Sequence, residues 1–263
     1  MNLRDLTGWF NSTLAGRFVV TADTVLSVDT KGGNAQVQLS ATVFFAQGGG
    51  QQSDVGEICG PNGKLRVEMV VSKEGEIIHT GKLLGSLVSG DFVHMQLKWA
   101  HRHHGMRLHT AGHALHEAVL SLTDSMVPVK ANHGSNAYLE YAGEFPSGVL
   151  GEVEARVNAL IAQDRPVFMC ESSLDDIKAK CRFVPAGLPT NKPLRTVQIA
   201  DGELVPCGGV HVRRLGEIGR VVLGNIKRDP KSGNTVLKYR ITKTEDAAPV
   251  VSPAEAMCLG GPS

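Results

Sequence analysis

The chain has 263 residues, of which 42% are hydrophobic and 20% charged, and its formal net charge is +1. This composition is ordinary for a globular protein, and the length allows one large domain or two smaller ones. It excludes a helical membrane protein, because no apolar run approaches the roughly 18 residues needed to cross a bilayer. The first residues lack the apolar core of a signal peptide. We therefore expect a soluble protein of the cytoplasm with no obligate protein partner.

The charges are distributed unevenly along the chain. Residues 1–97 carry 7 Lys/Arg against 9 Asp/Glu, whereas residues 98–245 carry 20 against 15. A nucleic-acid phosphate backbone would favour the basic region, although a mixed solvated surface explains the same numbers equally well. The five cysteines are odd in number and scattered, which indicates a reducing compartment rather than a disulfide framework.

The first 97 residues have the pattern of β-structure. Their strand-like segments alternate apolar and polar side chains or are rich in β-branched residues, and glycine-rich turns separate them. These segments are 18–30, 35–45, 64–81 and 91–99. Short strands at this spacing favour a small barrel or sandwich. We therefore expect an N-terminal β-rich subdomain over residues 1–97.

A mixed α+β region is expected to follow at 98–245. After a histidine- and arginine-rich stretch at 99–107, residues 108–122 have apolar side chains at helical spacing and predict a helix. A second helix is predicted at 147–163, with Ser147 as its N-cap. The other predicted elements are an extended segment at 127–143, a strand at 164–172, a short helix at 174–181, a strand and turn at 196–207 and a hairpin at 219–243. The composition of residues 246–263 predicts a disordered tail.

Two pairs of potential metal ligands stand out in this second region. His109 and His113 lie four residues apart in LHTAGHALHEAV, so a helix places both imidazoles on one face. Cys207 and His211 lie in PCGGVHV, where the glycines let the backbone turn back sharply. Together the pairs supply three nitrogens and one thiolate, which suits tetrahedral Zn²⁺.

Each pair alone is a weak signal, since most histidine pairs in helices are ordinary surface or core residues. The pairs gain weight together, and the backbone N–H groups of the glycine turn can face an anion or oxyanion. One familiar class of zinc enzyme is disfavoured. Zincin metalloproteases need Glu directly after the first histidine as a general base, and here Thr110 stands at that position.

HTAGH, PCGGVHV followed by GEIG, and an early GGGQQSDVG together resemble the editing region of alanyl-tRNA synthetases. The closest resemblance is to the freestanding alanyl-tRNA editing proteins of the AlaX type, over roughly residues 25–243. It implies a small barrel-like subdomain followed by an α+β zinc-binding editing domain. It also implies hydrolysis of the ester in mischarged Ser-tRNA(Ala) or Gly-tRNA(Ala), in trans. The zinc ligands carried over are His109, His113, Cys207 and His211.

The glycine-rich element contributes further candidates through the same resemblance. Gln51 matches the family's glutamine beside the substrate pocket, and Asp54 and Gly56 match later positions of that element. The resemblance thus implies Gln51, His109 and His113 as catalytic residues. Gln51 could contact the serine hydroxyl, orient the substrate or be a plain turn residue. A site that hydrogen-bonds this hydroxyl can reject alanine by roughly 10⁴-fold.

The chain also departs from the family pattern. Val210 replaces the threonine of CGGTHV, and Gln47 and Gly48 stand where Thr or Ser often precedes GGQ. Gln52 replaces a common proline. The polar residues help relatives to recognise the serine hydroxyl, so these departures bear on serine selectivity more than on hydrolysis.

The four-ligand set leaves the role of the metal open. Zn²⁺ can lower the pKa of a bound water towards about 7 or polarise a carbonyl, yet four protein ligands are more often structural. His109, His113 and Cys207 are the firmer ligands in this interpretation. The alternatives are a catalytically silent tRNA-binding module with a structural zinc, and a metal-dependent hydrolase of small esters or amides, which the missing zincin glutamate disfavours.

Basic residues flank both metal pairs and are candidate contacts to tRNA phosphates. They are Arg102, His103, His104, Arg107, Arg213, Arg214 and Arg220. For each of them a plain solvated cation is the competing interpretation. His116, three residues after His113, either supports a metal ligand or lies on the helix surface.

Overall fold

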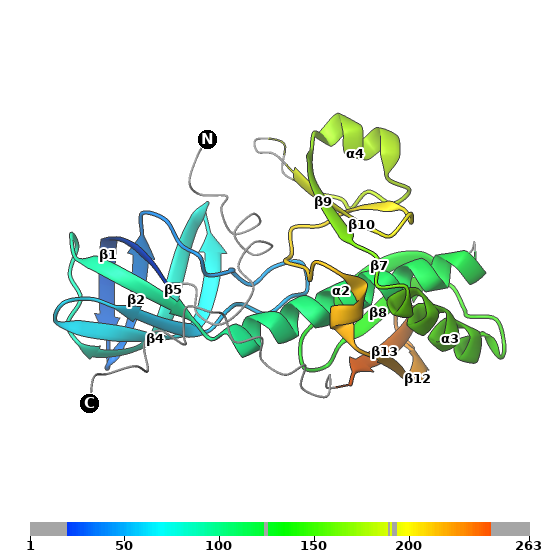
Figure 1. The fold of residues 1–263 in the computed structure, drawn as a ribbon, viewed down its shortest axis with the longest axis horizontal. Helices are drawn as coiled ribbons and strands as arrows, with labels where there is room; N and C mark the ends of the chain where they lie inside the picture. Colours follow the sequence, from blue (N-terminus) through cyan, green and yellow to red (C-terminus); the bar gives the residue numbers. More distant parts are fainter. Residues whose placement is uncertain (1–19, 124–125, 189, 191–193, 243–263) are drawn as a thin grey trace, which may run out of the picture.

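The computed structural model describes residues 20–123, 126–188, 190 and 194–242. The predicted tail at 246–263 lies outside these residues. A strand barrel occupies one end of the molecule, and helix α2 (Trp99–Leu122) runs from it into the α+β region (Figure 1). No helix within the described ranges is long and apolar enough to span a membrane.

The N-terminal strands close into a six-stranded antiparallel barrel in the order β1-β2-β5-β4-β3-β6. Alternation sets its core: in β2, Ala35, Val37 and Leu39 are buried and the residues between them face outward. Because closure leaves no edge of this sheet unpaired, the fold is the barrel rather than the sandwich of the two that the sequence allowed. The strands are β1 (Val20–Lys31), β2 (Asn34–Leu39), β3 (Gly56–Cys59), β4 (Gly63–Lys73), β5 (Glu76–Gly85) and β6 (Phe92–Leu97).

The prediction differs from the barrel in two places. Strand β3 has only four residues between glycine-rich turns, too few for a pattern, and the sequence did not predict it. The predicted strand 35–45 ends at Leu39, because the residues after it turn towards helix α2. The Val43 carbonyl, for example, accepts a hydrogen bond from Arg102 of that helix rather than from a strand.

Helix α2 ends where it was predicted to end but begins at Trp99, nine residues before the predicted start at 108. The added turns are rich in histidine and arginine and carry a buried charge, Arg102, at a core-facing position. A pattern of apolar residues cannot detect such a face. The Lys98 amide bonds the Val55 carbonyl, which fixes the start of the helix to the barrel.

The α+β region contains two antiparallel sheets, ordered β12-β13-β8-β7 and β11-β10-β9. Its core packs α2 against α3 and the first of these sheets, and it is separate from the core inside the barrel. The elements are β7 (Val127–Asn132), β8 (Tyr138–Ala142), α3 (Val149–Ala162), β9 (Val167–Ser172), α4 (Leu174–Lys180), β10 (Leu194–Ile199), β11 (Leu204–Pro206), η2 (Leu215–Ile218), β12 (Val221–Arg228) and β13 (Thr235–Ile241).

The predicted boundaries here need two corrections. Gly148, not Ser147, is the N-cap of α3, in a left-handed conformation (φ 82°). The strand predicted from residue 164 begins at Val167, because Asp164 adopts a positive φ in a turn. The short helix α4 is confirmed, with Ser173 accepting a hydrogen bond from the Asp176 amide at its start, and so is the β12–β13 hairpin.

Candidate metal centre

The two ligand pairs of the sequence meet in space. His109 and His113 project from α2, and Cys207 and His211 lie in the loop after β11. One side-chain atom of each residue lies within 4.8 Å of all the others. The Cys207 Sγ is 3.4 Å from Nε2 of His109 and 3.3 Å from Nε2 of His211.

These residues fit a tetrahedral metal ion. Zinc bond lengths of about 2.0 Å to nitrogen and 2.3 Å to sulfur separate such ligands by about 3.5 Å, close to the distances found. Nε2 of His113 is buried with no hydrogen-bond partner among the described residues. Buried polar atoms rarely stay unpaired, so this nitrogen fits the role of a metal ligand. The set suits zinc, although other cations share this preference.

The electrostatics of the cluster favour a bound cation. Burial lowers the pKa of His109 and His113 well below the usual range and that of His211 to about 3, so the imidazoles are in the neutral, ligating form. Burial raises the pKa of the Cys207 thiol to about 11, against the opposing effects of the Gly209 amide and a nearby arginine. A coordinated cation is what would stabilise the thiolate in this environment.

The second glycine of PCGGVHV is required by close packing. A Cβ on Gly209 would collide with the imidazole ring of His109. The Gly209 amide also donates a hydrogen bond to the Cys207 Sγ at 3.3 Å. The absence of a side chain therefore lets the loop approach α2 closely enough for both pairs to share one ion.

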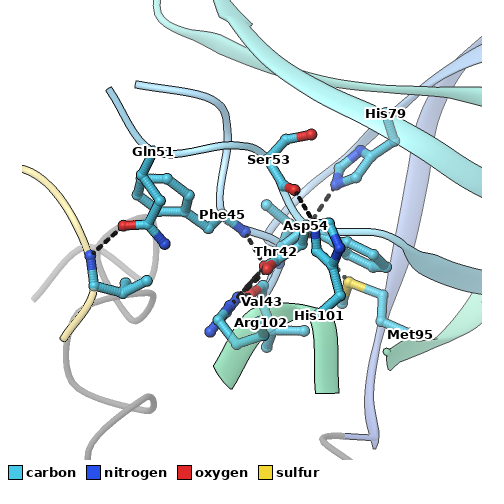
Figure 2. A network of polar contacts seen from close by, with 12 residues as sticks. Thr42, Val43, Phe45, Gln51, Ser53, Asp54, His79, Met95, His101 and Arg102 are labelled. Carbon is cyan, nitrogen blue, oxygen red and sulfur yellow. Dashed lines mark hydrogen bonds and ion pairs between the residues drawn. The ribbon is translucent and has the colours of Figure 1, made fainter. Parts of the chain in front are cut away.

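Gln51 orients a ligand of this centre. Its side chain (Figure 2) is buried. Oε1 accepts hydrogen bonds from Nδ1 of His109 (2.7 Å) and from the Val210 amide (3.1 Å). The proton on Nδ1 leaves Nε2 of His109 free for a metal. Gln51 therefore connects α2 to the loop that carries Cys207 and His211.

A tight turn brings Gln51 to this place. Gly48 and Gln51 exchange two backbone hydrogen bonds, and Gly49 and Gly50 between them have φ of 57° and 78°. Two consecutive positive φ values define a type I′ turn, which favours glycine at both positions. A Cβ on Gly50 would also lie 2.6 Å from the Ala131 carbonyl oxygen. These contacts explain the run of glycines before Gln51.

Asp54 and Arg102 form a buried ion pair that anchors this loop to α2 (Figure 2). Nε of Arg102 lies 2.7 and 2.8 Å from the two Asp54 carboxylate oxygens, and Nη2 donates to the Val43 carbonyl. Asp54 also accepts from the Phe45 amide at 2.6 Å. The guanidinium is 0% exposed and the carboxylate 3%, yet both residues line the pocket beside the ligand cluster, so Asp54 and Arg102 stay predicted substrate or tRNA contacts.

The remaining basic candidates divide by burial. Arg107 is buried and donates to the carbonyls of Ile218 and Thr242, and its role as a phosphate contact stays a prediction. Arg213 and Arg214 are exposed, the latter paired with Asp164. They remain predicted contacts, as do His103, His104 and Arg220.

His116 does not support a metal ligand directly. Its Nδ1 lies 2.9 Å from the Tyr141 hydroxyl, and its ring stacks on the ring of that tyrosine. The sequence left two interpretations open for His116: it supports a metal ligand, or it lies on the helix surface. Neither describes this half-buried residue.

His133 also lies beside the ligand cluster, and the sequence did not indicate it. The His133 ring stacks on that of His109 with the centroids 4.2 Å apart, and its Nδ1 lies 2.7 Å from the Tyr239 hydroxyl. No spacing connects it with the other histidines, so only the tertiary structure identifies it. His133 and Gln51 both line a pocket of about 100 Å³ next to the cluster. The other lining residues include Gln52, His104, Leu108 and Ser135.

A comparison with known protein families matches the N-terminal part of the chain. The family of tRNA synthetases class II (A) matches residues 12–101, which include the barrel and the glycine-rich loop. This match covers the part of the chain that carries Gln51 and ends before the first metal pair.

Similar proteins are found among alanyl-tRNA editing proteins and alanine–tRNA ligases. The alanyl-tRNA editing protein AlaX-L of Pyrococcus horikoshii is 32% identical over 74% of this chain and 48% of its own length. Alanine–tRNA ligases of Microcystis aeruginosa and Leptospira interrogans are 29% and 30% identical over 76% and 85% of this chain. The chain spans about half of AlaX-L and about a quarter of each ligase (24% and 23%). It is therefore related to the AlaX-type alanyl-tRNA editing proteins, as its motifs indicate.

Proposed function

We propose that the chain is a zinc-dependent hydrolase that removes serine or glycine from mischarged tRNA(Ala), in trans and in the cytoplasm. The observation that carries this proposal is the cluster of three imidazoles and one thiol, with the unpaired Nε2 of His113, directly beside a polar pocket. The relationship to an alanyl-tRNA editing protein supplies the substrate class.

The proposed chemistry is hydrolysis of an activated ester. A zinc ion held by His109, His113, Cys207 and His211 would supply Lewis-acid chemistry and help to orient the substrate. Gln51 keeps the His109 imidazole in the ligating tautomer through the bond to Nδ1. The pocket between the glycine-rich loop and α2 receives the aminoacyl group.

The rest of the tRNA would bind across the basic region. We propose a β-rich domain at 1–97 and an editing domain at 98–245, and His104 lies beside the pocket at the junction between them. Arg213 and Arg214 are exposed and follow His211 closely in the sequence, so they are candidates for phosphate contacts.

The test is deacylation of Ser-tRNA(Ala), Gly-tRNA(Ala) and Ala-tRNA(Ala) by purified protein of measured zinc content. We expect release of serine or glycine, with alanine spared. A zinc-replete protein that leaves both mischarged tRNAs intact contradicts the proposal.

A second candidate is a tRNA-binding module in which zinc is only structural. It is favoured by one observation, that all four ligands come from the protein, as in closed structural sites. It predicts tRNA binding without ester turnover, and loss of folded structure when zinc is removed. The same deacylation assay separates the two candidates.

A further inference from the structure

His133 connects the pocket to the metal centre. It follows β7, and its amide donates to the Gly50 carbonyl at 2.8 Å, which fixes it to the glycine-rich loop. Its ring lies nearly parallel to that of His109, with an interplanar angle of 19°. A group bound against His133 would therefore lie next to the ligand cluster.

The hydrogen bonds of Tyr239 determine which His133 nitrogen accepts. The Tyr239 hydroxyl donates to the Leu108 carbonyl at 3.1 Å, so its single proton is used. Its oxygen must then accept from Nδ1 of His133, 2.7 Å away. An imidazole that carries its proton on Nδ1 has a lone pair on Nε2. Among the described residues, this Nε2 has no hydrogen-bond partner.

The pocket has the size and polarity for a short aminoacyl group. Its volume of about 100 Å³ compares with about 30 Å³ for a water molecule in the liquid. Val210, at the position where relatives carry threonine, is fully buried and has no polar atom to offer a hydroxyl. Recognition of a side-chain hydroxyl must therefore come from another group lining the pocket.

We infer that His133 is a specificity-determining residue whose Nε2 accepts a hydrogen bond from the side-chain hydroxyl of a seryl group esterified to tRNA. The inference rests on the proposed function and names the substrate group that the pocket selects. Serine pairs its hydroxyl with Nε2, whereas alanine leaves this acceptor without a donor, and an unpaired polar group in a site is what rejects a substrate.

Binding of non-hydrolysable analogues tests this inference without relying on turnover. The probes are 3′-amino-3′-deoxyadenosine acylated with serine or with alanine, and titration calorimetry gives their affinities for the zinc-replete full chain. We expect the wild type to prefer the seryl analogue by about 10-fold or more, and His133→Phe to reduce this preference to within about twofold. Phenylalanine retains a ring against His109 but no acceptor.

Two further variants complete the experiment. Tyr239→Phe leaves His133 in place but removes the bond that fixes its tautomer, so the preference should fall partway. The matched control is His116→Phe, which removes an imidazole that is also bonded to a tyrosine hydroxyl but does not line the pocket. It should keep the seryl preference.

The outcomes distinguish this inference from the proposed function. A wild type that binds both analogues equally, or neither, overturns the inference, and so does a His133→Phe protein that keeps the preference. If His133→Phe fails to fold, an unchanged preference in Tyr239→Phe overturns it. A wild type that prefers the seryl analogue but cleaves no Ser-tRNA(Ala) contradicts the proposed function alone.

Discussion

The barrel and the α+β region each bury histidines, but they use them in opposite ways. In the barrel, Nδ1 of His79 lies 3.0 Å from the Val37 carbonyl and Nε2 lies 2.8 Å from the Thr42 hydroxyl (Figure 2). In the α+β region, Nε2 of His113 is equally buried and has no partner among the described residues.

This difference separates a structural histidine from a candidate ligand. Burial alone does not, because it lowers the pKa of both imidazoles. What differs is the pairing of the nitrogens and the company of other donors: His113 lies 5.1 Å from both His109 and His211, measured between ring centroids. A buried imidazole whose nitrogens are both paired needs no ion, whereas an unpaired one among neutral nitrogens and a thiol could hold one.

The largest effect is expected when the candidate ligand His113 is removed. His113→Ala should lose bound zinc, and deacylation should fall by more than about 100-fold, because even groups that only orient a ligand are worth 10–100-fold. Zinc content and Ser-tRNA(Ala) deacylation are measured on the same preparation.

His79→Gln is the matched control, because it alters a buried histidine that has both nitrogens paired. It should keep the zinc content of the wild type. Retained activity in a zinc-free His113→Ala protein would rule out the zinc mechanism.

The next largest effect is expected at the buried Asp54–Arg102 ion pair, which connects the glycine-rich loop to α2. Arg102→Met leaves the Asp54 carboxylate buried without its partner, so the free energy of unfolding should fall by about 3–5 kcal/mol. The double variant Arg102→Met/Asp54→Leu should recover part of this loss, since it removes both charges. Urea unfolding measures both variants.

Arg214→Met makes the same substitution in the exposed pair with Asp164 and should have a much smaller effect on the free energy of unfolding. If Arg102→Met proves no more destabilising than Arg214→Met, the Asp54–Arg102 pair is not the anchor we infer.

A smaller effect is expected at Gln51. Gln51→Ala should keep zinc and reduce deacylation by about 10–100-fold, because His109 loses the acceptor that fixes its tautomer. Gln51→Glu retains an acceptor oxygen for Nδ1 and should recover part of the activity. Steady-state rates on Ser-tRNA(Ala) and Ala-tRNA(Ala) provide the comparison, and unchanged rates for Gln51→Ala on both would remove Gln51 from the site.

The smallest effect is a pH dependence on the barrel side. Burial lowers the pKa of His79 to about 4 from the usual 6.5. Between pH 4 and 6.5 the His79 side chain binds a proton in the unfolded chain but not in the folded one. The contribution of neutral His79 to the free energy of unfolding is therefore fully present above pH 6.5 and is lost as the pH falls towards 4. From pH 7.5 to 5.5 this residue should cost roughly 1–2 kcal/mol of unfolding free energy.

Urea unfolding of the wild type and of His79→Gln at the two pH values isolates this contribution. The variant should lose less stability than the wild type over the same interval. Equal losses would mean that His79 takes up a proton as readily in the folded barrel as in the unfolded chain.

The sequence by itself determined the features that depend on local pattern or on chemistry at fixed spacing. Alternation predicted most barrel strands, and helical spacing placed His109 and His113 on one face of a helix whose end at Leu122 was correct. The type of each ligand, and the glycines beside Cys207, already indicated a site for one metal ion. The strand and helix predictions succeeded because each rests on residues a few positions apart.

Only the tertiary structure decided the contacts between distant segments. It gave Arg102 and Arg107 buried partners, extended α2 back to Trp99, and paired Gln51 with His109 across 58 positions. It also brought His133 to the pocket without any signal in its neighbours. Burial and pairing depend on what the whole chain packs around a side chain, and no local pattern of residue types contains that information.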